Sequence, residues 1–134
     1  MKLIVPDPYG IAGLSELNPR VDLSDLQLDR AARSYGMKAS PGATFDGPRP
    51  WIALEVTSMT EALPLSWLNF DEVMKGTVLV GYTPSGLPDD VLEMADMVVY
   101  IEQFDDAALM TRDQALAVFL HEAYQYSAKK RRRS

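Results

Sequence analysis

The chain has 134 residues, no cysteine, and a net charge of −6 from 13 basic and 19 acidic residues. This length predicts one domain, and the lack of cysteine excludes disulfides, thiolate zinc sites and a cysteine nucleophile. No apolar run approaches the roughly 20 residues of a membrane span, and prolines stop the apolar run at the N-terminus before it could serve as a signal peptide. We therefore expect a cytoplasmic protein with no membrane segment.

Positive charge is concentrated at the C-terminus. Five consecutive basic residues occupy positions 129–133, which leaves 8 basic residues to set against 19 acidic ones in the rest of the chain. The body is therefore a poor ligand for polyanions, whereas the segment 129–134 is a good one. We interpret residues 1–128 as a single domain and 129–134 as a basic tail, which either binds phosphates or is a solvated, disordered end.

The N-terminal half predicts two strands and one helix. A short apolar strand covers residues 2–5, and a helix follows at about 23–35, with apolar residues at helical spacing and Gly36 placed to end it. A clearer strand covers 51–57. Residues 60–70 stay ambiguous, because a proline interrupts any helix there.

The C-terminal half alternates strands and helices more plainly. Residues 77–80 and 97–101 are runs rich in β-branched side chains and bounded by turn residues, which predicts two buried strands. Between them Pro88 and the acidic residues after it suit the first turn of a short helix. The last helix covers about 111–126 and opens with a capping box, in which Gln114 reaches back to the first residue.

This alternation predicts an α/β fold, in which a mainly parallel sheet is covered by helices on both faces. In open sheets of this kind ligands bind beyond the carboxyl ends of the strands, so the loops 81–86 and 102–110 are the first candidates for a small-molecule site. The segment from Gly81 to Gly86 has neither the ending of a phosphate loop nor a dinucleotide fingerprint. Its glycines either let main-chain groups approach an adenine-containing ligand or make a tight turn.

Other candidate chemistry is weaker. The single histidine, His121, lies in the middle of the last helix, away from these loops, so we expect a surface or interface histidine rather than a catalytic one. An acidic cluster has the chemistry to bind a hard cation, although a helix terminus and a solvated face explain it more simply: Asp89, Asp90, Glu93 and Asp96. No metal is expected.

The predicted first helix and the residues that end it contain Arg30, Ala32, Tyr35 and Gly36. These residues match the second half of the pattern Asn-x-Gly-x-x-x-Arg-x-Ala-x-x-Phe-Gly. In this respect the chain resembles the SpoU group of SPOUT methyltransferases, which carry that pattern as their first motif. Ser24 and Leu26 stand where the family has Asn and Gly.

Two further motifs follow in the family's order. The second is a strand followed by Gly-x-Glu-x-x-Gly-Leu, which Gly81, Gly86 and Leu87 match, with Thr83 in place of the glutamate. The third opens the last helix, where Thr111 replaces an asparagine. Three motifs in the right order and spacing are more specific than any one of them.

The resemblance implies a fold and an activity. Members of the SpoU group are S-adenosylmethionine-dependent RNA ribose 2'-O-methyltransferases with a C-terminal trefoil knot, an exception to unknotted topology. They are homodimers with helices near both termini packed across a two-fold axis. The resemblance therefore implies an RNA substrate such as tRNA or rRNA, and places Arg30 near the ribose 2'-hydroxyl, where its fixed charge favours a developing alkoxide.

The same resemblance implies a site for S-adenosylmethionine among the loops after three strands, bound largely through backbone groups and apolar walls. The implied cofactor-binding residues are Val56, Thr57, Gly81, Thr83, Gly86, Leu87, Ile101, Gln103, Met110 and Thr111.

Two alternatives stay open. The missing Asn and Glu favour a catalytically inactive relative, which would be a dimeric binding or regulatory protein with the same fold. An unrelated flavodoxin-like α/β domain would also alternate strands and helices, and the path of the backbone from residue 76 to 125 distinguishes the two.

Overall fold

The computed structural model describes residues 1–5, 23–39, 47–55, 61–81, 87–103 and 110–133. The strands are β1 (Lys2–Ile4), β2 (Trp51–Glu55), β3 (Leu63–Pro64), β4 (Thr77–Val80) and β5 (Met97–Tyr100). The helices are α1 (Leu23–Arg33), α2 (Phe70–Val73), α3 (Asp89–Met94) and α4 (Arg112–Arg133), with a 3-10 turn, η1, at Leu65–Trp67.

All five strands run parallel in one sheet, in the order β1-β4-β2-β5-β3. The predicted parallel α/β sheet is therefore confirmed. Strand β4 lies between β1 and β2, and β5 lies between β2 and β3, so the later strands are inserted between the earlier ones. This order differs from the 2-1-3-4-5 order of flavodoxin-like domains, so the flavodoxin-like alternative is wrong.

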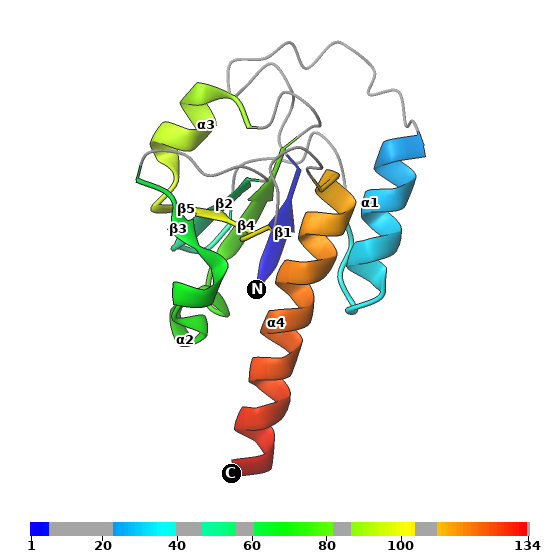
Figure 1. Ribbon diagram of the computed structural model, residues 1–134, viewed down its shortest axis with the longest axis vertical. Helices are drawn as coiled ribbons and strands as arrows, with labels where there is room; N and C mark the ends of the chain where they lie inside the picture. The colour runs from blue at the N-terminus through cyan, green and yellow to red at the C-terminus, as the bar shows by residue number, and fades with distance from the viewer. Residues whose placement is uncertain (6–22, 40–46, 56–60, 82–86, 104–109, 134) are drawn as a thin grey trace.

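Helices cover both faces of the sheet, as the alternation of elements predicts. On one face α1 and α4 pack side by side, and Leu28 of α1 and Phe119 of α4 are fully buried in the larger core cluster (Figure 1). On the other face α3 contributes Val91 to a smaller cluster that includes Trp51 and Leu79. Alternate residues of β2 therefore point into different clusters, which is why the strand is apolar almost throughout.

The first helix ends at Arg33, two residues before the predicted end. Gly36 has a φ of +76°, the left-handed conformation that glycine adopts without steric cost. The N–H of Met37 donates to the carbonyl oxygen of Ala32 over 3.0 Å, which closes the helix end in the way that such a glycine permits. The predicted role of Gly36 is confirmed.

The last helix is longer than the sequence pattern indicates. It was expected to end near residue 126, but α4 continues to Arg133 and includes the basic residues. Contacts with α2 explain the extension: the ring of Phe70 stacks on Tyr126, and Lys130 pairs with Asp71 at 2.9 Å. Apolar periodicity could not reveal these contacts because they are aromatic and ionic.

The ambiguous stretch before β4 resolves into the two-residue strand β3, the turn η1 and the single helical turn α2. Among the described residues, no helix combines the length and the apolar character that crossing a bilayer requires.

Candidate functional site

The carboxyl ends of three neighbouring strands meet at one edge of the sheet. In the registers of the parallel pairs, Leu54 of β2 lies opposite Val80 of β4, and Glu55 of β2 lies opposite Tyr100 of β5. The carboxyl ends of β4, β2 and β5 therefore lie side by side. We call this the carboxyl edge; it is where ligands bind in open parallel sheets.

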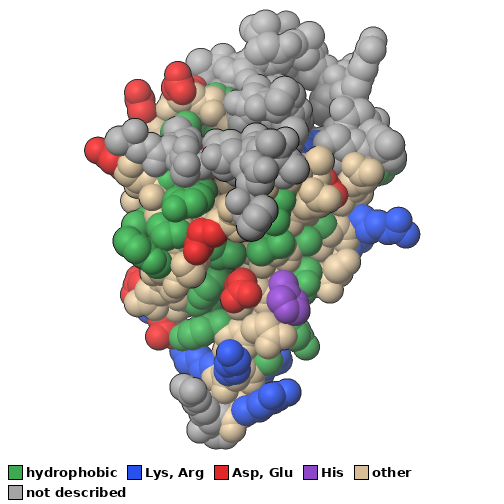
Figure 2. Space-filling model, viewed as in Figure 1, with side chains coloured by type: hydrophobic (Ala, Val, Ile, Leu, Met, Phe, Trp, Pro, Cys, Tyr) green, Lys and Arg blue, Asp and Glu red, His purple; other side chains and the backbone are tan. Residues whose placement is uncertain are grey.

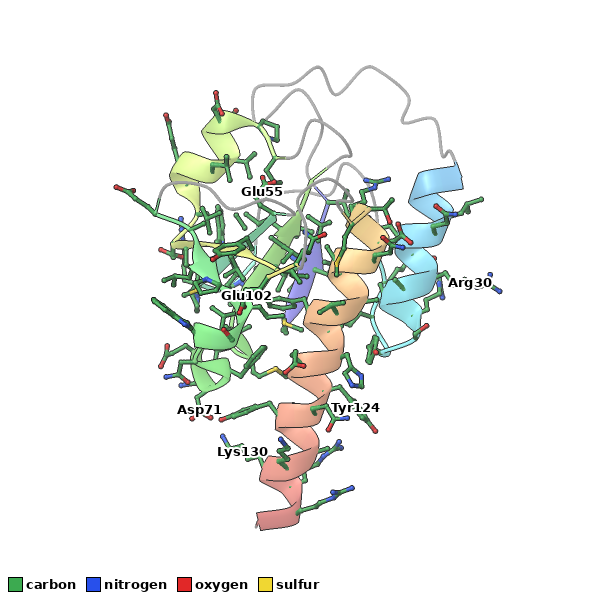
Figure 3. All side chains as sticks on the ribbon, viewed as in Figure 1. Arg30, Glu55, Asp71, Glu102, Tyr124 and Lys130 are labelled. Carbon is green, nitrogen blue, oxygen red and sulfur yellow. The ribbon has the colours of Figure 1, made fainter. Side chains whose placement is uncertain are left out.

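Glu55 ends β2 at the carboxyl edge and is only 7% exposed (Figure 3). Its Oε1 accepts the N–H of Leu87 over 3.0 Å, so it fixes the segment that leads into α3. Burial raises the pKa of the Glu55 carboxyl, and the hydrogen bond from Leu87 opposes that shift without cancelling it. A carboxyl with a raised pKa at a ligand-binding edge is a candidate functional group.

Apolar side chains flank the carboxyl edge from both faces of the sheet. Leu87 is buried in the cluster on the α3 face, whereas Ile101 is buried in the cluster on the α4 face, with Met110 packed against that cluster. Gly81, directly after β4, is buried as well. The predicted apolar residues thus lie on opposite sides of the edge rather than along one wall.

The start of α4 is tied to the end of β5. The Oε1 of Gln103 accepts the N–H of Met110 over 2.9 Å, which connects the two ends of the segment 104–109. Gln114 accepts the N–H of Thr111 over 3.0 Å, so the backward-reaching half of the predicted capping box is confirmed. Gln103, Met110 and Thr111 therefore belong to one hydrogen-bonded unit that borders the carboxyl edge.

Four predicted cofactor-binding residues lie outside the described residues: Val56, Thr57, Thr83 and Gly86. Their roles stay predictions. Within the described ranges, no group of three or more His, Cys, Asp or Glu side chains is arranged to hold a metal ion.

Arg30 lies apart from the carboxyl edge of its own chain. It is exposed on the outer side of α1, and its side chain points away from the sheet and from Glu55 (Figure 3). The structure therefore brings the described members of the predicted cofactor site to one edge but does not bring Arg30 to them within a single chain.

Two buried charged residues were not predicted as site residues. Glu55 ends the run Trp-Ile-Ala-Leu-Glu, and a single charge that closes an otherwise apolar strand is a signal that could have identified it. Arg112 is 4% exposed and is the first residue of α4. A cation is unfavourable in the first turn of a helix, so its position there is also a signal that another interaction holds it.

No protein-family model matches the sequence, and no curated protein matches it. Solved structures do share its fold. The SpoU methyltransferase AviRb from Streptomyces viridochromogenes, in complex with AdoMet, has a TM-score of 0.70 and 11% identity over 96% of this chain and 61% of AviRb. The A. aeolicus TrmH/SpoU tRNA modifying enzyme has a TM-score of 0.64 and 12% identity over 96% of this chain and 76% of its own.

A probable methylase family protein from Haemophilus influenzae gives a TM-score of 0.61 at 11% identity, over 90% of this chain and 63% of its own. The chain therefore has the fold of the SpoU/TrmH methyltransferases, and the resemblance seen in its motifs is confirmed at the level of the fold. The present chain covers about three fifths of the length of AviRb.

Proposed function

We propose that this protein is an S-adenosylmethionine-dependent RNA ribose 2'-O-methyltransferase of the SpoU type, a knotted homodimer in the cytoplasm that acts on tRNA or rRNA. One observation carries the proposal: the carboxyl ends of the adjacent strands β4, β2 and β5 lie together at the carboxyl edge, in a fold shared with AviRb, whose structure is in complex with AdoMet. Three motifs of the SpoU group lie in the right order along the same chain.

The residues present at the carboxyl edge fit a bound adenosyl group. Buried Gly81 has no side chain to obstruct a ligand, and Leu87 and Ile101 offer apolar surface from the two faces of the sheet. Adenine is flat and largely apolar, so apolar contacts and main-chain hydrogen bonds suit it. Glu55 contributes indirectly, because its hydrogen bond with the Leu87 N–H fixes the main chain next to the bound ligand. When bound, S-adenosylmethionine supplies a methyl group on a positively charged sulfur.

The acceptor side is proposed to come from the partner protomer. Arg30 points outward from α1, and the neighbouring surface carries exposed apolar side chains, with Leu26 58% and Tyr124 52% exposed. Helices α1 and α4 packed across a two-fold axis would cover this surface. Arg30 of one protomer would then stand beside the carboxyl edge of the other, where its charge binds a phosphate and favours the developing ribose alkoxide.

Two measurements test this function. Calorimetry with S-adenosylmethionine is expected to give a saturable heat, and its absence at millimolar ligand would count against the donor site. Transfer of a labelled methyl group to tRNA and rRNA that lack their modifications is expected to give a 2'-O-methylated nucleoside on digestion. A methylated base instead would contradict the ribose assignment.

Arg30 has a matched control one turn away on the same helix. The variant Arg30→Ala should lose methyl transfer and keep the affinity for S-adenosylmethionine. Arg33→Ala removes the same charge from α1, at a residue whose guanidinium pairs with Asp29 at 2.7 Å, and should keep most activity. Retained activity in Arg30→Ala would remove Arg30 from its role.

The proposed exchange of residues between protomers can be tested separately. At S-adenosylmethionine concentrations well below saturation, mixed dimers of Arg30→Ala and Glu55→Leu protomers should methylate RNA faster than either variant alone, because each mixed dimer retains one complete site. No recovery in mixed dimers would place both residues in the same protomer's site.

A second candidate follows from Thr111, which is exposed and is shorter than the asparagine of the family. If the protein binds S-adenosylmethionine but methylates no RNA, the catalytically inactive dimeric binding or regulatory protein becomes the better interpretation.

A further inference from the structure

The two ends of α4 lie in different surroundings. Its first half packs against the sheet and α1, whereas its last turns extend beyond the sheet toward the C-terminus (Figure 1). At a rise of 1.5 Å per residue, this helix spans about 30 Å. Its basic end is therefore remote from the carboxyl edge, at which α4 begins.

The basic end is a fixed helix rather than a loose tail. The rings of Phe70 and Tyr126 stack with centroids 5.9 Å apart, and the Tyr126 hydroxyl donates to the Asp71 carboxylate. Lys130 pairs with the same carboxylate at 2.9 Å. The hydroxyl of Tyr126 and then the ammonium of Lys130 hold the pKa of Asp71 below its ordinary value, so this carboxylate stays charged at neutral pH. Helix α2 thereby supports α4 as far as Lys130.

The cations at this end lie at the surface of the molecule. Lys129, Lys130, Arg131 and Arg132 are all exposed, and the side chain of Lys130 remains 70% exposed although it pairs with Asp71. Successive helical residues are about 100° apart, so these charges surround the helix. Figure 2 shows Lys and Arg side chains gathered at this end of the molecule.

An exposed aromatic ring lies on the element that leads into α2. Trp67 is 75% exposed, in contrast to Trp51, which is 7% exposed in the core. Trp67 belongs to η1, which Leu68 and Asn69 connect to α2, and the N–H and hydroxyl of the neighbouring Ser66 donate to the Glu102 carboxylate after β5. Proteins that bind unpaired nucleotides combine cations for the phosphates with exposed aromatic rings for the bases.

We propose that the last turns of α4 and Trp67 contact one RNA: the last turns lie remote from the methyl-transfer site, whereas Trp67 lies beside Ser66, whose N–H and hydroxyl donate to Glu102 next to the carboxyl edge. The cations bind phosphates and Trp67 stacks on an unpaired base. The choice of RNA rests on the proposed function. The separation of about 30 Å along α4 means that an RNA that reaches both places is extended or folded rather than a short oligonucleotide.

The chemistry of the helix end disfavours a membrane surface as the partner. A helix that lies in a lipid interface needs a face of large apolar side chains opposite its charges. The segment from Ser127 to Arg132 contains only serine, alanine and basic residues, so it offers no such face. The basic side chains attract phosphate groups without the help of an apolar face.

The test uses Trp67 as its own reporter. In a Trp51→Phe background Trp67 is the only tryptophan, and titration with an unmodified tRNA transcript should quench its fluorescence. The triple variant Lys129→Gln/Arg131→Gln/Arg132→Gln keeps Lys130 on Asp71 and uses a good helix former. It should bind RNA at least tenfold more weakly and lower the salt slope by about 2–3, because roughly one counterion is released per phosphate contact.

The matched control is Arg33→Gln/Lys38→Gln, which removes exposed cations near the end of α1 and should change RNA affinity less than twofold. Trp67→Ala should weaken binding by about fivefold or more, since stacking on an aromatic ring contributes substantially per base. Circular dichroism should show an unchanged helix content in each variant.

The outcomes separate this RNA contact from the proposed function. Unchanged RNA affinity in the triple variant, or no quenching of Trp67, overturns the contact even if methyl transfer is found. Weakened RNA binding in the triple variant supports it even if S-adenosylmethionine does not bind. Poly-glutamate should bind more weakly than RNA. If it binds the wild type as tightly as RNA does, and the triple variant loses affinity for both to the same extent, the partner is an acidic protein and the assignment to RNA is overturned.

Discussion

The two edges of the sheet differ in how their side chains are bonded. At the amino edge, where the strands begin, the Asp96 carboxylate accepts the N–H of Trp51 at 2.7 Å and a guanidinium N–H of Arg49 at 3.0 Å. The Arg49 guanidinium lies 3.9 Å from the centre of the Trp51 ring. At the carboxyl edge, Glu55 is buried and accepts the N–H of Leu87.

The two carboxylates show the contrast through their pKa values. The hydrogen bond from the Trp51 N–H holds the pKa of Asp96 below its ordinary value, whereas burial raises the pKa of Glu55. Hydrogen bonding thus stabilises the charged form of Asp96, whereas burial destabilises the charged form of Glu55. The amino edge is therefore held together by hydrogen bonds and an ion pair, whereas the carboxyl edge, the proposed ligand site, contains a buried carboxyl group.

The largest effect is expected at the amino edge, from Gly76→Ala. Gly76 precedes β4, and a Cβ atom there would lie 2.1 Å from the carbonyl oxygen of Pro50. Because main-chain atoms cannot yield as a flexible side chain does, the variant should lose about 3 kcal/mol of unfolding free energy. Urea denaturation measures the loss.

The control is the same substitution at Gly36. A Cβ there meets nothing within 4 Å, so Gly36→Ala should cost only the strain of the left-handed conformation, about 1 kcal/mol. Equal losses in the two variants would show that the close approach at Gly76 is not what makes the amino edge rigid.

Asp96→Ala should have a smaller effect and lower the unfolding free energy by about 1 kcal/mol. The variant loses the hydrogen bond from the Trp51 N–H, but the Asp96 side chain is 41% exposed, which limits the loss. Since the folded-state pKa is lowered, the contribution of Asp96 is present above the ordinary value of 3.8 and is lost as the pH falls through the lowered value. Denaturation at acid and neutral pH should show a smaller difference between the variant and the wild type at acid pH. An equal difference at both would contradict the lowered pKa of Asp96.

The smallest effect on stability is expected at the carboxyl edge, from Glu55→Leu. The variant removes a buried charge but leaves the Leu87 N–H without its acceptor, and these effects oppose each other. The affinity for S-adenosylmethionine should nevertheless fall about tenfold, or ~1.4 kcal/mol, because the main chain at Leu87 is no longer fixed. Glu55→Gln keeps an acceptor and should bind nearly as well as the wild type. Calorimetry measures both, and a loss in Glu55→Gln equal to that in Glu55→Leu would show that the charge matters instead.

Glu55 also gives the two edges opposite pH behaviour. Its raised pKa means that its protonation favours the folded state, so its contribution is fully present below the ordinary value of 4.5 and is lost as the pH rises through the raised value. In the wild type, protonation of Glu55 should raise the unfolding free energy as the pH falls. In Glu55→Gln, which cannot be protonated there, this increase should be absent. A pH dependence unchanged from the wild type would contradict the raised pKa.

Particular residues show what could be predicted from the sequence. The strands at 77–80 and near 51–57 and the helix stop at Gly36 follow from local rules of periodicity and backbone conformation, and all were predicted. The end of α4 was not, because Phe70 and Asp71 stabilise it from a distant part of the chain. The strand order was not predicted, since insertion of β4 and β5 between earlier strands leaves no local pattern.

The candidate site was predictable in part. The loops 81–86 and 102–110 were predicted from the rule that ligands bind at the carboxyl ends, whereas the loop after β2 was implied only by the family resemblance. The burial of Glu55 and its hydrogen bond to Leu87 were not, because they depend on how α3 packs on the sheet. The outward direction of Arg30 was also not predicted, because a single sequence does not reveal which side of a helix faces a partner.

The most direct test of the account is a titration of ¹⁵N-labelled protein with S-adenosylmethionine, followed by amide chemical shifts. We expect the amide signals of Gly81, Leu87, Ile101 and Gln103 at the carboxyl edge to move and to saturate together. The amides of Trp51, Thr77 and Asp96 at the amino edge should stay in place. Shifts confined to the amino edge, or no shifts at millimolar ligand, would contradict the claim that the carboxyl ends of β4, β2 and β5 form the donor site.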